Sequence, residues 1–143
     1  METECYPIEV RKRRPDLTVV QQACPDLAGA IERGAPRGDL RCLVERYVAE
    51  LRQTAESTSG HVILGCTHYP LVADLFAAAL PGGVPIIHQP EATAAALKSY
   101  LDRHPEYDAP GTGCRRFLST GFSADALPLT ERFWGGKLLF EQA

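Results

Sequence analysis

Short apolar runs alternate with amphipathic stretches of helical length over residues 1–103, and this alternation constrains the fold more than any other feature. β-forming or apolar runs fall at 17–22, 61–65 and 84–88, and helical stretches at 25–32, 39–57, 70–80 and 91–103. Strands that alternate with helices in this way build parallel sheets covered by helices. We therefore predict an α/β fold, a small parallel sheet flanked by helices.

The stretch 39–57 is the clearest predicted helix. Its apolar residues share one helical face, and they are Leu40, Leu43, Val44, Tyr47, Val48, Leu51 and Ala55. Charged residues occupy the opposite face, as expected of a helix that packs on a core with one side.

Residues 104–143 read differently from the rest of the chain. Residues 104–113 are rich in proline, glycine and charge, which indicates a linker. The tail that follows predicts a strand at 116–120 and a helix at 124–134, which Pro128 would kink or delay. We therefore divide the chain into an α/β domain, 1–103, and a linker with a C-terminal tail, 104–143.

Length and composition narrow the class of protein. The 143 residues, with a net charge of −3, suit one globular domain and argue against a nucleic-acid partner. The basic run 11–14 is interpreted as a solvated helix end. No apolar run approaches the roughly 20 residues of a spanning helix, so we expect a cytoplasmic protein with no membrane partner.

The cysteines and lysines bear on cofactors. Five cysteines without a CxxC pair favour neither a disulfide framework nor a zinc site, and they suit a reducing compartment. The three lysines stand in polar contexts unlike a pyridoxal-phosphate site. We expect no cofactor and no metal.

Cys66, Thr67 and His68 lie where the apolar run 61–65 meets the next predicted helix. In open α/β sheets, ligands bind at such strand ends, where backbone N–H groups and the helix dipole converge. The same dipole favours a thiolate, and a nearby histidine is able to hold or deliver its proton. The alternative is that Cys66 is a small buried apolar residue and His68 a cap.

Two segments carry a family resemblance. The string VILGCTHYPL, residues 62–71, resembles the motif around the second catalytic cysteine of glutamate racemases, and VVQQACPDLAGAIERG, residues 19–34, is similar to an earlier segment of that family. Later matching segments are PIIHQPEATAAALKSYL, RRFLSTG and ERFWG. The resemblance implies the second half of a two-domain, pseudo-symmetric aspartate/glutamate racemase. In that family the C-terminal tail packs on the first half, which is missing here, so the resemblance implies that the tail 104–143 docks differently, dimerises or remains mobile.

The resemblance also implies an activity and a set of site residues. Two thiols flank the α-carbon of glutamate in this family and interconvert L- and D-glutamate without a cofactor, for peptidoglycan precursors. Cys66 would be the thiol facing L-glutamate, with His68 as its acid/base helper. Thr67 would contact a substrate carboxylate, and Glu32 would be an auxiliary carboxylate. Aspartate racemases tend to carry glutamate where this chain has His68, which favours glutamate as the substrate.

The chain departs from the family pattern in ways that leave alternatives open. It contains neither the Asp-Ser contact nor the Cys-Asn-Thr segment of the family's first half, and His88-Gln89 replaces a common Asp-Ser, as Phe122 replaces a common Asp. A racemase needs two bases on opposite faces of a carbanion. A homodimer or the missing N-terminal half would supply the second base.

Three other readings stay open. The chain could be a non-catalytic remnant or a regulatory module that binds a carboxylate. It could act on a related acidic amino acid, or be a truncated fragment of a longer racemase.

Overall fold

A computed structural model describes residues 4–55, 60–107, 113, 115–120, 127–136 and 138–143. Mixed helices and short strands form the fold, as predicted. The α-helices are α1 (Cys5–Arg13), α2 (Leu27–Glu32), α3 (Arg37–Thr54), α4 (Ala73–Ala79), α5 (Gln89–Arg103) and α6 (Leu127–Trp134). The 3₁₀ helices are η1 (Tyr69–Val72) and η2 (Pro105–Tyr107), and the strands are β1 (Val62–Ile63), β2 (Ile86–Ile87), β3 (Phe117–Ser119) and β4 (Phe140–Gln142).

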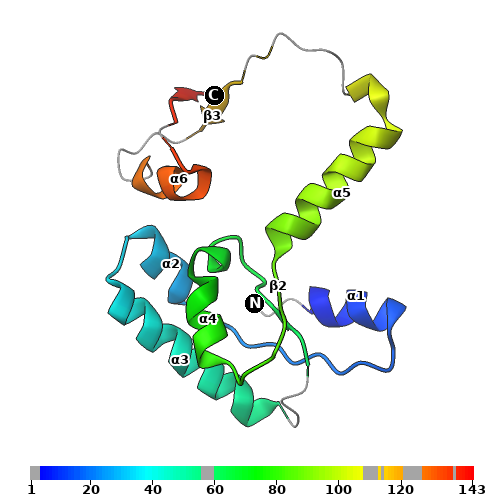
Figure 1. The fold of residues 1–143 in the computed structure, drawn as a ribbon, viewed down its shortest axis with the longest axis vertical. Helices are drawn as coiled ribbons and strands as arrows, with labels where there is room; N and C mark the ends of the chain where they lie inside the picture. Colours follow the sequence, from blue (N-terminus) through cyan, green and yellow to red (C-terminus); the bar gives the residue numbers. More distant parts are fainter. Residues whose placement is uncertain (1–3, 56–59, 108–112, 114, 121–126, 137) are drawn as a thin grey trace.

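The strands of the described residues form two small parallel sheets (Figure 1). In the first, Val62 of β1 pairs with Ile86 of β2, and the helical segments η1 and α4 connect the two strands. In the second, Phe117 of β3 pairs with Phe140 of β4 across α6. Both connections are βαβ crossovers, which confirms the predicted α/β class.

The strand predicted at 17–22 is wrong. The segment carries neither helix nor strand, and none of the described backbone hydrogen bonds joins residues 18–22 to β1 or β2. Leu17 and Val20 are exposed, so no sheet face is buried against the core here. The β preference of Thr18, Val19 and Val20 has no partner strand to express it, because strand propensity reflects pairing and burial more than the backbone itself.

The core lies between α2, α3, α4 and the end of β1. α3 contributes the row that the helical spacing predicts, namely Leu40, Val44, Tyr47 and Val48. Against it pack Leu27 and Ile31 of α2, Leu64 after β1, and Leu75 and Phe76 of α4. Leu27 and Val44 have no exposed surface, so α2 and α3 share the centre of this core.

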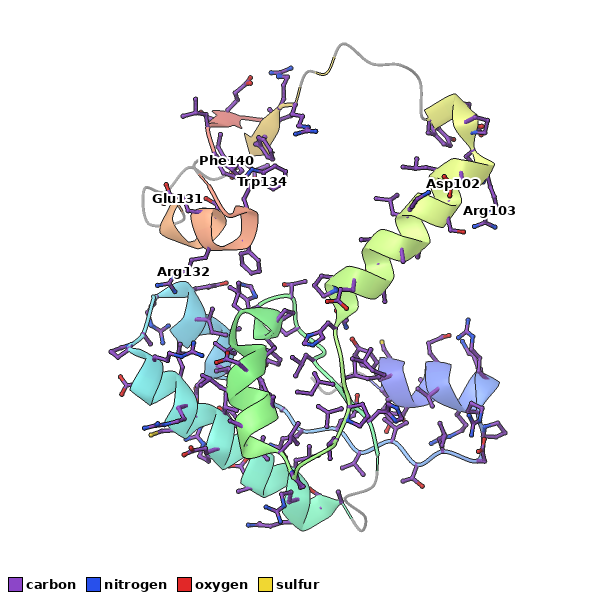
Figure 2. The ribbon with its side chains drawn as sticks, viewed as in Figure 1. Asp102, Arg103, Glu131, Arg132, Trp134 and Phe140 are labelled. Carbon is purple, nitrogen blue, oxygen red and sulfur yellow. The ribbon has the colours of Figure 1, made fainter. Side chains whose placement is uncertain are left out.

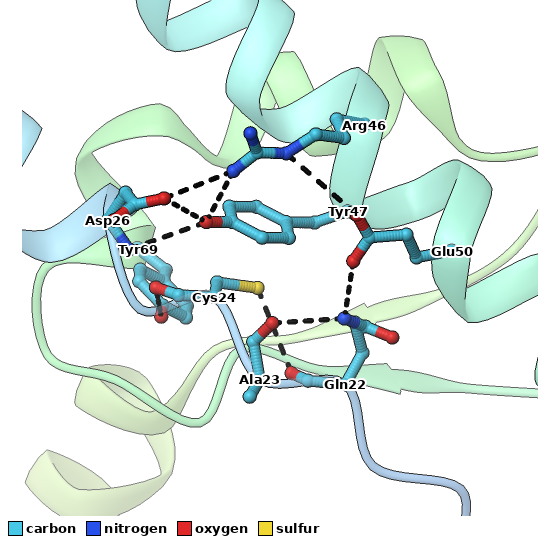
Figure 3. Close-up of polar contacts among 8 residues, drawn as sticks. All are labelled: Gln22, Ala23, Cys24, Asp26, Arg46, Tyr47, Glu50 and Tyr69. Carbon is cyan, nitrogen blue, oxygen red and sulfur yellow. Dashed lines mark hydrogen bonds and ion pairs between the residues drawn. The ribbon is translucent and has the colours of Figure 1, made fainter.

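Tyr47 brings a hydroxyl into this core, and the hydroxyl is fully used (Figure 3). It donates to Asp26 Oδ2 at 3.1 Å, and it accepts from the Asp26 backbone N–H at 3.3 Å and from Arg46 Nη2 at 2.8 Å. The segment just before this turn is also bonded to α3, because Gln22 Nε2 donates to the Glu50 carboxylate at 2.9 Å. These bonds attach the turn before α2 to α3.

The C-terminal part leaves this core and returns to it. α5 has no buried residue and leads away from the body, whereas α6 lies above α2 and α4 (Figure 1). Within the tail, Phe117 contacts Trp134 and Phe140 with ring centroids 5.2 and 6.0 Å apart. The helix predicted at 124–134 is described from Leu127, with Pro128 in its first turn where no backbone N–H is needed. Residues 121–126 lie outside the described residues.

Helix bounds elsewhere depart only slightly from the predictions. The helix expected at 70–80 begins as the 3₁₀ segment η1 before α4 takes over. The basic run 11–14 lies at the end of α1, with its side chains exposed, as predicted.

The Tyr47 contacts predict a stability effect. Tyr47→Phe removes the partner of the Asp26 N–H and one of the two partners of the Asp26 carboxylate, which keeps Arg46. We expect it to lower the free energy of unfolding by about 1–2 kcal/mol. Urea denaturation followed by circular dichroism measures this. Tyr107→Phe, at an exposed tyrosine of η2, is the matched control and should change the value by less than about 0.5 kcal/mol. Equal effects of the two substitutions would contradict the role given to Tyr47.

Candidate functional site

Cys66, Thr67 and His68 form the loop between β1 and η1, at the carboxyl end of a parallel strand. The loop is closed locally, because the Tyr69 N–H donates to the Cys66 carbonyl at 3.2 Å and the Leu71 N–H donates to the His68 carbonyl at 3.1 Å. The following segment packs on α3, so the loop is anchored on both sides.

The loop side chains converge on one imidazole. His68 Nδ1 lies 3.7 Å from Cys66 Sγ and 3.4 Å from Thr67 Oγ1. On the other side of the ring, His68 Nε2 lies 2.9 Å from Glu32 Oε1, a residue of α2. The structure thus brings the four residues singled out from the sequence into one continuous set of contacts.

This arrangement has a defined direction for protons. A carboxylate only accepts hydrogen bonds, so Nε2 carries the hydrogen that points at Glu32. In the neutral ring Nδ1 is then an acceptor for the Cys66 S–H. The imidazole is therefore placed to exchange a proton with the thiol while Glu32 fixes its orientation and its tautomer.

Cys24 offers a contrast within the same fold. Its S–H donates to the Gln22 carbonyl at 3.7 Å, and burial raises the pKa of the Cys24 thiol. Its neighbour Tyr69 donates to the Cys24 carbonyl at 3.2 Å, and burial likewise raises the pKa of the Tyr69 phenol. Burial therefore favours the protonated forms of the Cys24 thiol and the Tyr69 phenol.

Tyr6, a residue that the sequence did not single out, packs against the loop at Gly65. A Cβ placed on Gly65 would come within 3.3 Å of the Tyr6 ring, and the Gln89 amide donates to the Tyr6 hydroxyl. Tyr6 of α1 therefore packs directly beneath the residue before Cys66. A glycine at a strand end signals close approach of another group, although it does not say which group.

The upper side of the site meets the C-terminal tail. The Phe133 ring of α6 lies 5.6 Å from the His68 ring at an interplanar angle of 80°, an edge contact. The sequence placed Phe133 within a matching segment but gave no sign of this contact, because the two residues are far apart along the chain.

Among the described residues, no group of three or more His, Cys, Asp or Glu side chains is arranged to hold a metal ion. None of the described helices is long and apolar enough to cross a membrane.

Relatives of known sequence cover nearly all of the chain. No protein-family model matches it. A glutamate racemase of Phenylobacterium zucineum (strain HLK1) is 54% identical over 138 residues, which are 96% of this chain and 49% of the relative. A glutamate racemase of Caulobacter sp. (strain K31) is 52% identical over 139 residues, again 96% and 49%. The chain spans about half the length of the curated relatives it matches.

Solved structures of glutamate racemases are also similar to this chain. A glutamate racemase of Francisella tularensis, crystallised with D-glutamate, has a TM-score of 0.84 at 21% identity and is similar over 98% of this chain and 52% of its own. A glutamate racemase isoform of Bacillus anthracis has a TM-score of 0.78 at 29% identity over 96% and 51%. In sequence and in fold, the chain is therefore a homologue of the glutamate racemases that corresponds to their C-terminal half.

Proposed function

We propose that this chain supplies one of the two proton-transfer groups of a glutamate racemase, with Cys66 as the reacting thiol. The observation that carries the proposal is the contact series from Cys66 through His68 to Glu32 at the end of β1. The relatives' names and the D-glutamate in the Francisella structure support glutamate as the substrate.

The proposed step is a proton transfer at the α-carbon of L-glutamate. The Cys66 thiolate takes the α-proton, the C–H electron pair stays on the substrate as a carbanion, and the thiolate becomes a thiol. His68 receives a proton from Cys66 when the thiolate forms, because Nδ1 faces the sulfur. Glu32 stabilises the imidazolium that results, and the Thr67 hydroxyl is available to a substrate carboxylate.

Inversion requires more than this one loop. A single positioned group returns the proton to the face from which it came, so a second acid must stand on the opposite face of the carbanion. We propose that the second thiol comes from an N-terminal half like that of the relatives, or from a second copy of the chain. Exchange of the α-proton and inversion are therefore separable properties.

The proposal includes the organisation of the chain. Residues 1–103 form the domain that carries Cys66, and residues 104–143 form a tail, whose strands β3 and β4 make a sheet of their own. The four described cysteines are free thiols. Free thiols suit a reducing, cytoplasmic location.

Exchange without inversion is the first expected result. In heavy water, the chain should exchange the α-proton of L-glutamate, followed by NMR, while chiral chromatography detects no D-glutamate. Cys66→Ser should slow the exchange by at least about 10²-fold, because it removes the proton-transfer group. Cys42→Ser, at an exposed cysteine of α3, is the matched control and should exchange like the parent. Binding of glutamate without exchange would instead identify a carboxylate-binding module.

Inversion should appear when a second thiol is supplied. We expect D-glutamate to form when the chain is mixed with the N-terminal half of the Phenylobacterium relative, and Cys66→Ser to abolish it. Inversion by the chain alone that rises with the square of its concentration would identify a second copy as the source. Exchange that never becomes inversion in either experiment would contradict the two-thiol proposal.

The Glu32 and His68 contacts predict graded losses. His68→Gln removes the proton acceptor beside Cys66, and Glu32→Gln keeps the shape but removes the charge that faces Nε2. We expect the exchange rate to fall by roughly 10²-fold for His68→Gln and by roughly tenfold for Glu32→Gln, consistent with general acid–base and supporting contributions. Glu45→Gln, on the exposed side of α3, is the control. If Glu32→Gln and Glu45→Gln exchanged at the same rate, Glu32 would have no role.

A further inference from the structure

The His68 imidazole is held on three sides, and only two of them belong to the proposed proton path. Cys66 and Thr67 face Nδ1, and Glu32 faces Nε2. The third contact is the edge-on ring of Phe133, 5.6 Å away at 80°. The His68 side chain is 20% exposed, whereas the Glu32 side chain beside it is 52% exposed.

Phe133 reaches His68 because α6 lies against the end of α2. A Cβ on Gly34 would stand 3.6 Å from Arg132 Nη2, so the Arg132 guanidinium is close to the turn that ends α2. Figure 2 shows Arg132 between α6 and α2. Gly34 has φ +67 and carries no side chain in the way, and a cation there suits the carbonyl end of a helix. α6 therefore lies close to the end of the helix that carries Glu32.

An aromatic edge contact has a specific effect on an imidazole. Two hydrogen bonds define the direction of the ring nitrogens, but water competes for both when the ring is open to solvent. The Phe133 residue is itself 47% exposed, so its ring covers one side of the imidazole from water. The edge-to-face geometry that aromatic pairs favour also restricts rotation of the imidazole. Removal of the competing water strengthens both polar contacts.

We propose that Phe133 is a positioning residue for His68: its ring keeps the imidazole between Glu32 and Cys66, so that the C-terminal tail completes the candidate site. The significance for catalysis rests on the proposed function, whereas the positioning itself does not. Among the described residues, the charged and titratable groups near His68 or its contacts include Glu32 from α2, Cys66 from the loop and Arg132 from α6. Cys24 and Tyr69 interact electrostatically with Cys66.

The test uses the Nε2–H proton of His68, observed by NMR in the full chain. An imidazole N–H that is hydrogen-bonded and shielded from water gives a direct signal, and His68→Gln assigns it by its loss. We expect the parent chain to show this signal. Phe133→Leu should speed its exchange with water by at least about tenfold or abolish the signal, because the edge contact that excludes water is gone. Phe133→Tyr keeps the ring and should restore it.

Matched variants separate positioning from general damage to the tail. Trp134→Leu removes a ring from the same helix, but Trp134 contacts Phe117 and not His68 among the ring contacts of the described residues, so the His68 signal should remain. Unchanged circular dichroism would show that Phe133→Leu leaves the fold intact. A protected signal in Phe133→Leu, or no protected signal in the parent, would overturn the proposal.

The effect of Phe133 on proton transfer to glutamate is measured separately. If the parent exchanges the glutamate α-proton, Phe133→Leu should slow that exchange by about tenfold, since small displacements of a reacting group are costly, and Phe133→Tyr should restore it. A parent that exchanges no α-proton refutes the proposed function and leaves the N–H result to decide the positioning.

Discussion

The apolar face of α3 is the surface on which the rest of the structure depends. α2 and α4 both pack against it, and these two elements flank the candidate site, since α2 carries Glu32 and α4 continues the segment that follows His68. Glu32 and His68 come from separate parts of the chain, and they meet at 2.9 Å because α2 and the helical segment after His68 both pack on α3. The geometry of the site is thus a consequence of core packing.

The sequence predicts much of the fold and of the candidate site where a segment has one clear pattern of apolar residues. The α3 face follows from apolar residues at helical spacing, and the Cys66 loop follows from an apolar run that ends at a proline-initiated helical segment. The same reasoning wrongly predicted a strand at 17–22, because a strand forms only beside a partner strand, and the sequence does not show whether one is present. Phe133 was missed for a related reason, since nothing local in the sequence specifies a contact with His68. Glu32 was found only through the family resemblance.

The comparison of Cys24 with Cys66 shows how one fold gives two thiols different environments. Cys24 lies in a turn tied to α3, where burial raises the pKa of the thiol and its hydrogen goes to a backbone carbonyl. Cys66 lies at a strand end beside an imidazole that a carboxylate orients. Two cysteines of one chain therefore have different environments, and the residues around each thiol make the difference.

The distance along the chain between Phe133 and the rest of the site bears on how the protein folds. Contacts that are local in sequence form sooner than contacts that close long loops. The α2–α3 and α3–α4 contacts span short segments, whereas α6 reaches His68 only after the whole of α5 and the linker have been made. We therefore expect a folding order in which the loop of Cys66, Thr67 and His68 is in place on the α3 core before the Phe133 ring comes to lie against the His68 ring.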